Sequence, residues 1–108
     1  MLTKEELPEC PVATTVQLIG NKWKLLILRN LIYNGNQRFT DFIKTIPAIS
    51  KKVLTDNLRS LEDDGIVERE VFAEVPPRVV YSLSALGKSL KPILDAMVIW
   101  GTDYKNNL

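Results

Sequence analysis

The period of the apolar residues changes twice along the chain. Up to residue 64, apolar side chains recur every three or four positions, which is typical of amphipathic helices. Over residues 67–83 they alternate with polar side chains, which is typical of strands, and the helical period then returns. The pattern therefore predicts a run of helices, a pair of strands and a final helix.

Two helices are predicted before residue 34. Pro11 favours a helix start directly after Cys10, because the missing N–H of proline needs no partner in a first turn. Gly20 ends this helix, and Asn21 is a suitable N-cap for the next, over residues 22–33. That second helix is apolar on most of its sides, so we expect it to be the most buried.

The third predicted helix is short. Arg38 and Phe39 fit a small strand, and Thr40 is then the expected N-cap of a helix that Pro47 closes. Its inward-facing residues are expected to be Phe42, Ile43 and Ile46.

A fourth helix follows after a short turn at residues 48–49. Ser50 is its expected N-cap, and Gly65 supplies the left-handed residue that ends it near Asp64. At about 100° per residue, one face carries leucines and the other carries polar side chains. The leucines are Leu54, Leu58 and Leu61, and the opposite residues are Lys52, Thr55, Asp56 and Arg59, with Lys51 at the edge of the apolar stripe.

The alternation after Gly65 predicts an antiparallel hairpin with strands over residues 67–72 and 79–83. Its tip contains Pro76 and Pro77, which stiffen it and remove two amide donors. Ser84 is the expected N-cap of a long last helix, and Pro92 should kink or locally open that helix.

The predicted order of elements is α-α-α-α-β-β-α, a mainly α fold with a small β-hairpin. A helix, a short turn, a second helix and then a hairpin is the order of a winged helix-turn-helix. The 108 residues suit one domain. We expect residues 1–9 to form an N-terminal arm and residues 10–108 to form that single domain.

Composition argues against several classes of site. The chain has one cysteine and no histidine, which excludes an internal disulfide, a zinc site of Cys and His ligands within one chain, and a histidine general base. There is no glycine-rich phosphate loop, and the acidic run at residues 62–64 falls where a helix ends. We therefore expect a protein that is not an enzyme and has no metal or cofactor.

Charge is unevenly distributed, although the net charge is only +1. Residues 21–60 hold eight Lys or Arg against two Asp, whereas the segments on either side are acidic. A module that faces phosphate needs such a basic stretch, although solvated helix faces give the same pattern.

The polar face of the fourth helix combines cations with short hydrogen-bonding side chains, which suits a reader of the DNA major groove. Its N-terminus is also favourable for a phosphate. Arg78 follows the stiff hairpin tip and is placed to reach a minor groove or a phosphate, or else to pair with Glu74. The candidate DNA contacts are Ser50, Lys51, Lys52, Thr55, Asp56, Arg59, Arg78 and Arg38.

Several segments together resemble the HxlR-type regulators, a MarR-like winged-helix family. They are Cys10-Pro11, Ile19-Gly20-Asn21-Lys22-Trp23, Arg38-Phe39, Ile46-Pro47-Ala48-Ile49-Ser50, Leu54-Thr55, Leu58-Arg59, Glu74-Val75-Pro76-Pro77-Arg78-Val79 and Leu86-Gly87. The likeness runs from Cys10 to about Trp100. It implies a homodimer on a palindromic operator, with the terminal helices at the dimer interface and the helix over residues 50–64 in the major groove.

The same resemblance implies a thiol switch at Cys10, because several relatives sense oxidants or electrophiles with the cysteine before this proline. Thiolate is the reactive form, and a helix N-terminus favours it, whereas Glu9 opposes it. The products open to a lone thiol are an inter-subunit disulfide, a mixed disulfide and a sulfenic acid. The alternative is a small residue packed near the dimer interface.

The last helix has more apolar residues than one domain face needs, so we expect it to be a dimerisation helix. The candidate interface residues are Val12, Val16, Ile93, Met97, Ile99 and Trp100. Such a dimer places its two reading helices about 34 Å apart, one turn of DNA.

The sequence thus predicts a transcription regulator that binds double-stranded DNA and itself, with repression as the default because a dimer on a promoter blocks polymerase. The alternative is a winged-helix module that binds an acidic protein. The N-terminus lacks the apolar core of a secretory signal and no apolar run spans a bilayer, so we expect no membrane contact and a cytoplasmic location. The sequence does not indicate an effector.

Overall fold

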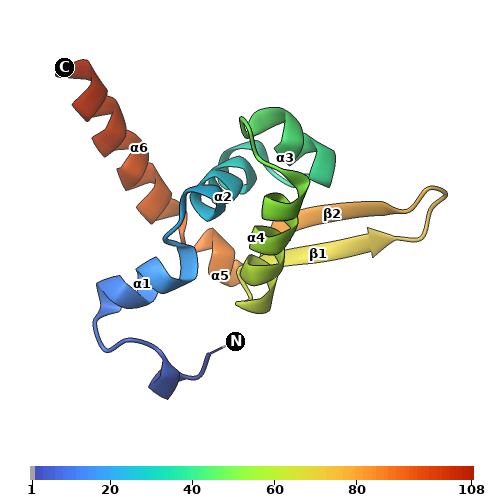
Figure 1. The fold of residues 1–108 in the computed structure, drawn as a ribbon, viewed down its shortest axis with the longest axis horizontal. Helices are drawn as coiled ribbons and strands as arrows, with labels where there is room; N and C mark the ends of the chain where they lie inside the picture. The colour runs from blue at the N-terminus through green and yellow to red at the C-terminus, as the bar shows by residue number, and fades with distance from the viewer. Residues whose placement is uncertain (1) are drawn as a thin grey trace.

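The computed structural model describes residues 2–108 as a helical body from which a hairpin and two helices, α1 and α6, extend (Figure 1). Helix α1 (Pro11–Ile19) precedes the helices of the body, which are α2 (Lys22–Asn34), α3 (Phe39–Thr45) and α4 (Lys51–Asp63). They are followed by β1 (Val67–Phe72), β2 (Arg78–Leu83), α5 (Ala85–Lys88) and α6 (Lys91–Asn106), and a short 3-10 helix, η1 (Lys4–Glu6), precedes α1. This is the predicted winged helix-turn-helix.

Helix boundaries follow from caps that the sequence carries. The side-chain oxygen of Asn21 accepts the backbone N–H of Lys24 at 2.8 Å and begins α2, as predicted. Gly35 and Gly65 end α2 and α4 with positive φ angles of 80° and 74°, a conformation that glycine adopts without strain.

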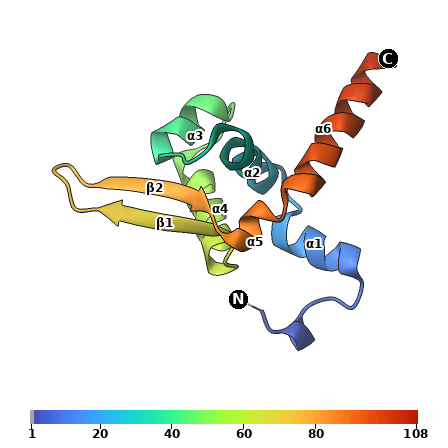
Figure 2. The ribbon, with the colours of Figure 1, turned by 180° about the vertical axis from the view of Figure 1, so that it is seen from behind.

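The core lies where α2, α3 and α4 meet the base of the hairpin. Its fully buried residues include Ile27 and Leu28 of α2, Phe42 of α3, and Leu54 and Leu61 of α4. Helix α2 is central, as predicted, and even its polar Asn30 is 1% exposed. Figure 2 shows α6 leaving this body at an angle, with its C-terminal end far from the hairpin.

The hairpin is antiparallel, with Arg69 opposite Tyr81 and Phe72 opposite Arg78. Its base is fixed by Ser84, whose hydroxyl donates to the carbonyl of Gly65 at 2.6 Å and also caps α5 by accepting the N–H of Gly87 at 3.0 Å. A Cβ at Gly87 would lie 2.2 Å from the carbonyl oxygen of Ile66, so only glycine fits this close approach.

The prediction for the start of α3 was wrong. Arg38 and Phe39 form no strand: Arg38 is the N-cap residue and Phe39 begins the helix, so Thr40 lies inside it. The reason is Asp41, whose carboxylate accepts the backbone N–H of Arg38 at 2.8 Å. This hydrogen bond caps the helix at Arg38, so the helix begins before Thr40. The strand-like contact is a single bridge between Gln37 and Tyr81.

The prediction of a single long C-terminal helix was also wrong. The chain forms two helices, α5 and α6, separated at Ser89 and Leu90. Pro92 lies in the first turn of α6, where its missing N–H costs no hydrogen bond. It therefore marks the start of a separate helix.

Candidate nucleic-acid interface

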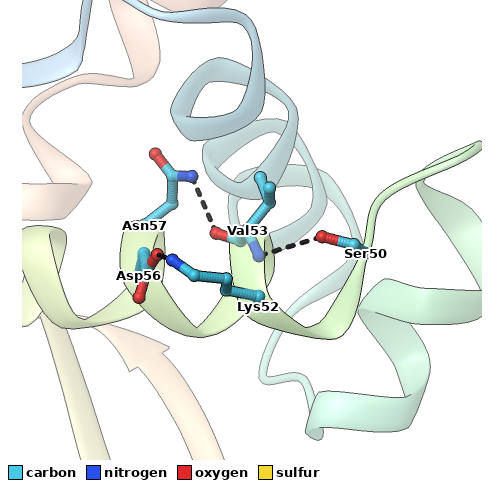
Figure 3. A network of polar contacts seen from close by, with 5 residues as sticks. All are labelled: Ser50, Lys52, Val53, Asp56 and Asn57. Atoms are coloured by element: carbon cyan, nitrogen blue, oxygen red, sulfur yellow. Dashed lines mark hydrogen bonds and ion pairs between the residues drawn. The ribbon is translucent and has the colours of Figure 1, made fainter.

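Helix α4 is held in place by a tight turn from α3. Ala48 in this turn has a φ of 63°, which is uncommon for a residue with a side chain. Ser50 then begins α4: its hydroxyl accepts the N–H of Val53 at 3.1 Å (Figure 3). The turn and the cap together fix the direction in which α4 leaves α3.

The two faces of α4 differ as the helical projection predicts. Leu54, Leu58 and Leu61 are at most 2% exposed and anchor the helix to the core. The candidate residues Ser50, Lys51, Lys52, Asp56 and Arg59 are exposed, and Thr55 is half-buried between the two faces. Six of the eight candidate DNA contacts thus lie on α4 or at its N-cap, and three of them, Lys52, Asp56 and Arg59, lie on the side opposite the leucines.

The outer face carries one internal ion pair. Lys52 Nζ lies 2.7 Å from Asp56 Oδ2, and the two side chains are 85% and 54% exposed (Figure 3). An exposed pair of this kind contributes little to stability, so the ammonium group exchanges easily to a phosphate or base. Lys51 and Arg59 make no ion pair within residues 2–108.

Asn57 is a residue that sequence reasoning missed. Its amide donates to the carbonyl of Val53 at 2.8 Å, within α4 (Figure 3). Its side-chain oxygen accepts from the amide of Asn21 at 3.2 Å. The N-cap of α2 is therefore linked directly to α4. No local signal in the sequence reveals a contact between residues 36 positions apart.

Arg69 was also missed, because the alternation assigned it only to a strand. Its Nε lies 3.4 Å from Glu62 Oε2 on α4. Together with Thr55, Arg59 and Tyr81 these two residues line a cavity of about 180 Å³ between α4 and the hairpin. Burial raises the pKa of Tyr81, and the nearby Arg69 opposes that rise. Arg69 adds a cation beside the outer face of α4.

Arg78 contacts an acidic side chain and an aromatic ring within the hairpin. Its guanidinium lies 3.1 Å from the carboxylate of Glu74 and 3.9 Å from the ring centroid of Phe72. The pairing with Glu74 is thus present in the structure, and a role in a DNA groove requires this exposed pair to open. Arg38 is exposed at the start of α3, beside the bridge to the hairpin.

Cys10 is exposed and directly precedes α1, where it is the N-cap residue. Val12 and Val16 lie one turn apart on α1 and are 72% and 57% exposed. Val12 and Val16, two of the candidate interface residues, therefore form an exposed apolar face on the helix that Cys10 begins.

Helix α6 exposes an apolar stripe. Ile93, Met97 and Trp100 line one concave surface, and Tyr104 stacks on Trp100 with ring centroids 5.4 Å apart. Ile99 is exposed too, but at about 100° per residue it lies roughly 160° around the helix from Met97. The candidate interface residues of α6 therefore fall on two sides of the helix.

Within residues 2–108 no three His, Cys, Asp or Glu side chains are grouped to hold a metal ion. None of the helices that these residues form has the length and apolar content needed to cross a bilayer.

Comparisons with known proteins agree with this fold. The model of the HxlR-like helix-turn-helix family matches residues 18–108. The HTH-type transcriptional regulator YdeP of Bacillus subtilis is 43% identical over 106 residues, which cover 98% of this chain and 82% of the relative. An HTH-type transcriptional regulator of Methanothermobacter thermautotrophicus is 48% identical over 95 residues, 88% of this chain and 72% of that protein.

Two solved regulators are also similar. The oxidised form of the redox regulator HypR superposes with a TM-score of 0.82 at 45% identity, covering 87% of this chain and 96% of that chain. Diamide-treated YodB from B. subtilis superposes with a TM-score of 0.71 at 35% identity, covering 88% of this chain and 94% of that chain.

Proposed function

Because the chain belongs to the HxlR-like helix-turn-helix family of transcriptional regulators, we propose that it is a homodimeric repressor that binds a palindromic operator. Helix α4 lies in the major groove, the hairpin reaches the neighbouring backbone or minor groove, and α1 and α6 form the dimer interface. It acts in the cytoplasm and needs no cofactor. Repression follows from a dimer that occupies promoter DNA and blocks polymerase.

The observation that carries this proposal is the division of α4 into two faces. Leu54, Leu58 and Leu61 are buried, so Lys52 and Arg59 face outward on a helix whose direction is fixed by the turn before it. Lysine and arginine bind phosphates and guanine edges, and the short side chains beside them suit other base edges.

Selection of genomic fragments by the purified protein tests the proposal. We expect enrichment of an inverted repeat whose half-site centres lie about 10 bp apart, since a two-fold dimer repeats its reading helix once per turn of DNA. Affinity should fall steeply as salt rises, because phosphate contacts release counterions. Failure to enrich any sequence would instead favour a module that binds an acidic protein partner.

We also propose that Cys10 makes this repressor responsive to oxidants. The thiol is exposed and lies at the start of α1, next to the apolar face of Val12 and Val16 that we assign to the dimer. Two similar proteins support the assignment: HypR is a redox regulator, and the YodB structure is of the diamide-treated protein. Operator affinity with and without diamide decides it: the wild type should respond and Cys10→Ser should not. Equal responses of the two proteins would rule the sensor out.

A further inference from the structure

Helix α6 is attached to the body at few points. Within residues 2–108, Leu94 is the one buried residue of α6, at 5% exposure. The apolar residues around it are exposed. One buried side chain fixes a position but leaves the tilt of a helix free. A second contact is needed to set its direction.

Asp95, the next residue, supplies that second contact. The hydroxyl of Tyr33, at the end of α2, donates to Asp95 Oδ1 at 2.5 Å, a length expected between a hydroxyl and a carboxylate. Lys91 Nζ donates to Asp95 Oδ2 at 2.8 Å and lies 5.8 Å from the centroid of the Tyr33 ring. Both carboxylate oxygens are thus engaged. The side chains of Lys91 and Asp95 are 56% and 40% exposed, and the hydrogen bond from Tyr33 is the one that links α6 to α2.

We propose that Asp95 is a positioning residue that, by bridging Tyr33 and Lys91, sets the angle between α6 and the body that carries α4. This inference rests on the proposed function, in which α6 joins two subunits. The angle then determines how far apart the two α4 helices lie on an operator.

The geometry makes the angle sensitive to a small change. Helix α6 has 16 residues and is therefore about 24 Å long, so a tilt of about 10° moves its far end by about 4 Å. That displacement is comparable to the rise of about 3.4 Å per base pair along DNA. Loss of the bridge should therefore shift or blur the preferred half-site spacing by about one base pair.

Asp95 and the apolar stripe lie on opposite sides of α6. At about 100° per residue, Asp95 lies roughly 140–180° from Ile93, Met97, Trp100 and Tyr104. One side of α6 therefore faces α2 through Asp95, and the other side presents the apolar stripe to a second subunit. The hydrogen bonds from Lys91 and then Tyr33 also hold the pKa of the Asp95 carboxyl below its usual value.

The test uses operators that differ only in the spacer between half-sites, shortened or lengthened by one or two base pairs. For the wild type we expect about 10-fold or greater preference for one spacer. For Asp95→Ala and Tyr33→Phe we expect that preference to fall below about 3-fold, while the dimer and the affinity for a single half-site stay within about 2-fold of the wild type. Asp103→Ala is the matched control, since Asp103 is an α6 carboxylate whose side chain makes no hydrogen bond within residues 2–108.

Asp95→Ala with an unchanged spacer preference overturns the proposal. A wild type that binds no palindrome is a failure of the proposed function instead, and a second measurement then still tests the role of Asp95. Spin labels at Lys44→Cys and Asn107→Cys, in a Cys10→Ser background diluted with unlabelled protein, report the distance between α3 and the end of α6. Asp95→Ala should broaden or shift that distance distribution, and an unchanged distribution contradicts the proposal.

Discussion

The side-chain amide of Asn21, the N-cap of α2, donates a hydrogen bond to the side-chain oxygen of Asn57 in the middle of α4, at 3.2 Å. Asn21 thus has two tasks, since its own oxygen also accepts the N–H of Lys24. The central helix and the helix that we assign to the major groove share one hydrogen-bonded joint.

This joint predicts that changes at the two positions are not additive. Asn21→Ser keeps a good N-cap but removes the donor, and Asn57→Ala removes the acceptor. Each single variant should lose about 0.5–1.5 kcal/mol for the hydrogen bond, and Asn57→Ala should regain about 0.5 kcal/mol from helix propensity. Urea denaturation of the four proteins in the cycle should give a coupling energy of at least about 0.5 kcal/mol. Strict additivity would show that the joint contributes nothing.

Gly87 should tolerate a side chain poorly. Gly87→Ala places a Cβ 2.2 Å from the carbonyl oxygen of Ile66, so we expect a loss of about 1–3 kcal/mol in the free energy of unfolding. Gly101→Ala is the control: its Cβ meets nothing within 4 Å, and alanine is favoured over glycine in a helix. Denaturation curves that rank these two variants in the opposite order would contradict the packing of α5 against the hairpin base.

The apolar stripe of α6 predicts a dimer that a charge will disrupt. Met97 and Trp100 are 46% and 70% exposed, which leaves a large apolar surface facing water in a single subunit. Met97→Lys should therefore be monomeric in sedimentation velocity at micromolar concentration, while the wild type and Asp103→Lys remain dimeric. A monomeric wild type under these conditions would refute the interface.

Much of the fold and the faces of α4 can be predicted from the sequence, because short-range chemistry decides them. Asn21 and Ser50 are N-caps, Gly65 ends α4, and the leucines of α4 repeat with the helical period. The start of α3 was misplaced because Thr40 suits an N-cap, whereas the N-cap is Arg38, whose backbone N–H is accepted by Asp41 in the first turn.

Contacts between distant segments were not predictable in this way. Asn57 with Asn21, Arg69 with Glu62, and Asp95 with Tyr33 each join elements whose relative placement depends on the whole core. The break before α6 is another example, since Pro92 fits either a kinked helix or a new helix start.

The Asp95 bridge also predicts a titration. Its pKa lies below the ordinary value, so the stability that the bridge contributes is complete above the unfolded-state pKa of about 3.9 and is lost as the pH falls through the lower folded-state pKa. Carboxyl-carbon NMR should show the pKa of Asp95 rising toward its ordinary value in Lys91→Ala and, to a smaller extent, in Tyr33→Phe. A Tyr33→Phe protein with an unmoved Asp95 titration would mean that the hydroxyl does not hold the carboxylate.

The central claim is that the outer face of α4 reads DNA, and the affinity of a Lys52→Ala, Thr55→Ala, Arg59→Ala triple variant for the selected operator tests it most directly. At about 1–3 kcal/mol for each lost base or phosphate contact, we expect the Kd to rise at least about 100-fold. Lys88→Ala with Lys105→Ala, which removes two exposed cations away from α4, should change the Kd by less than about 3-fold. A triple variant that is folded and dimeric yet binds the operator as tightly as the wild type would contradict the account.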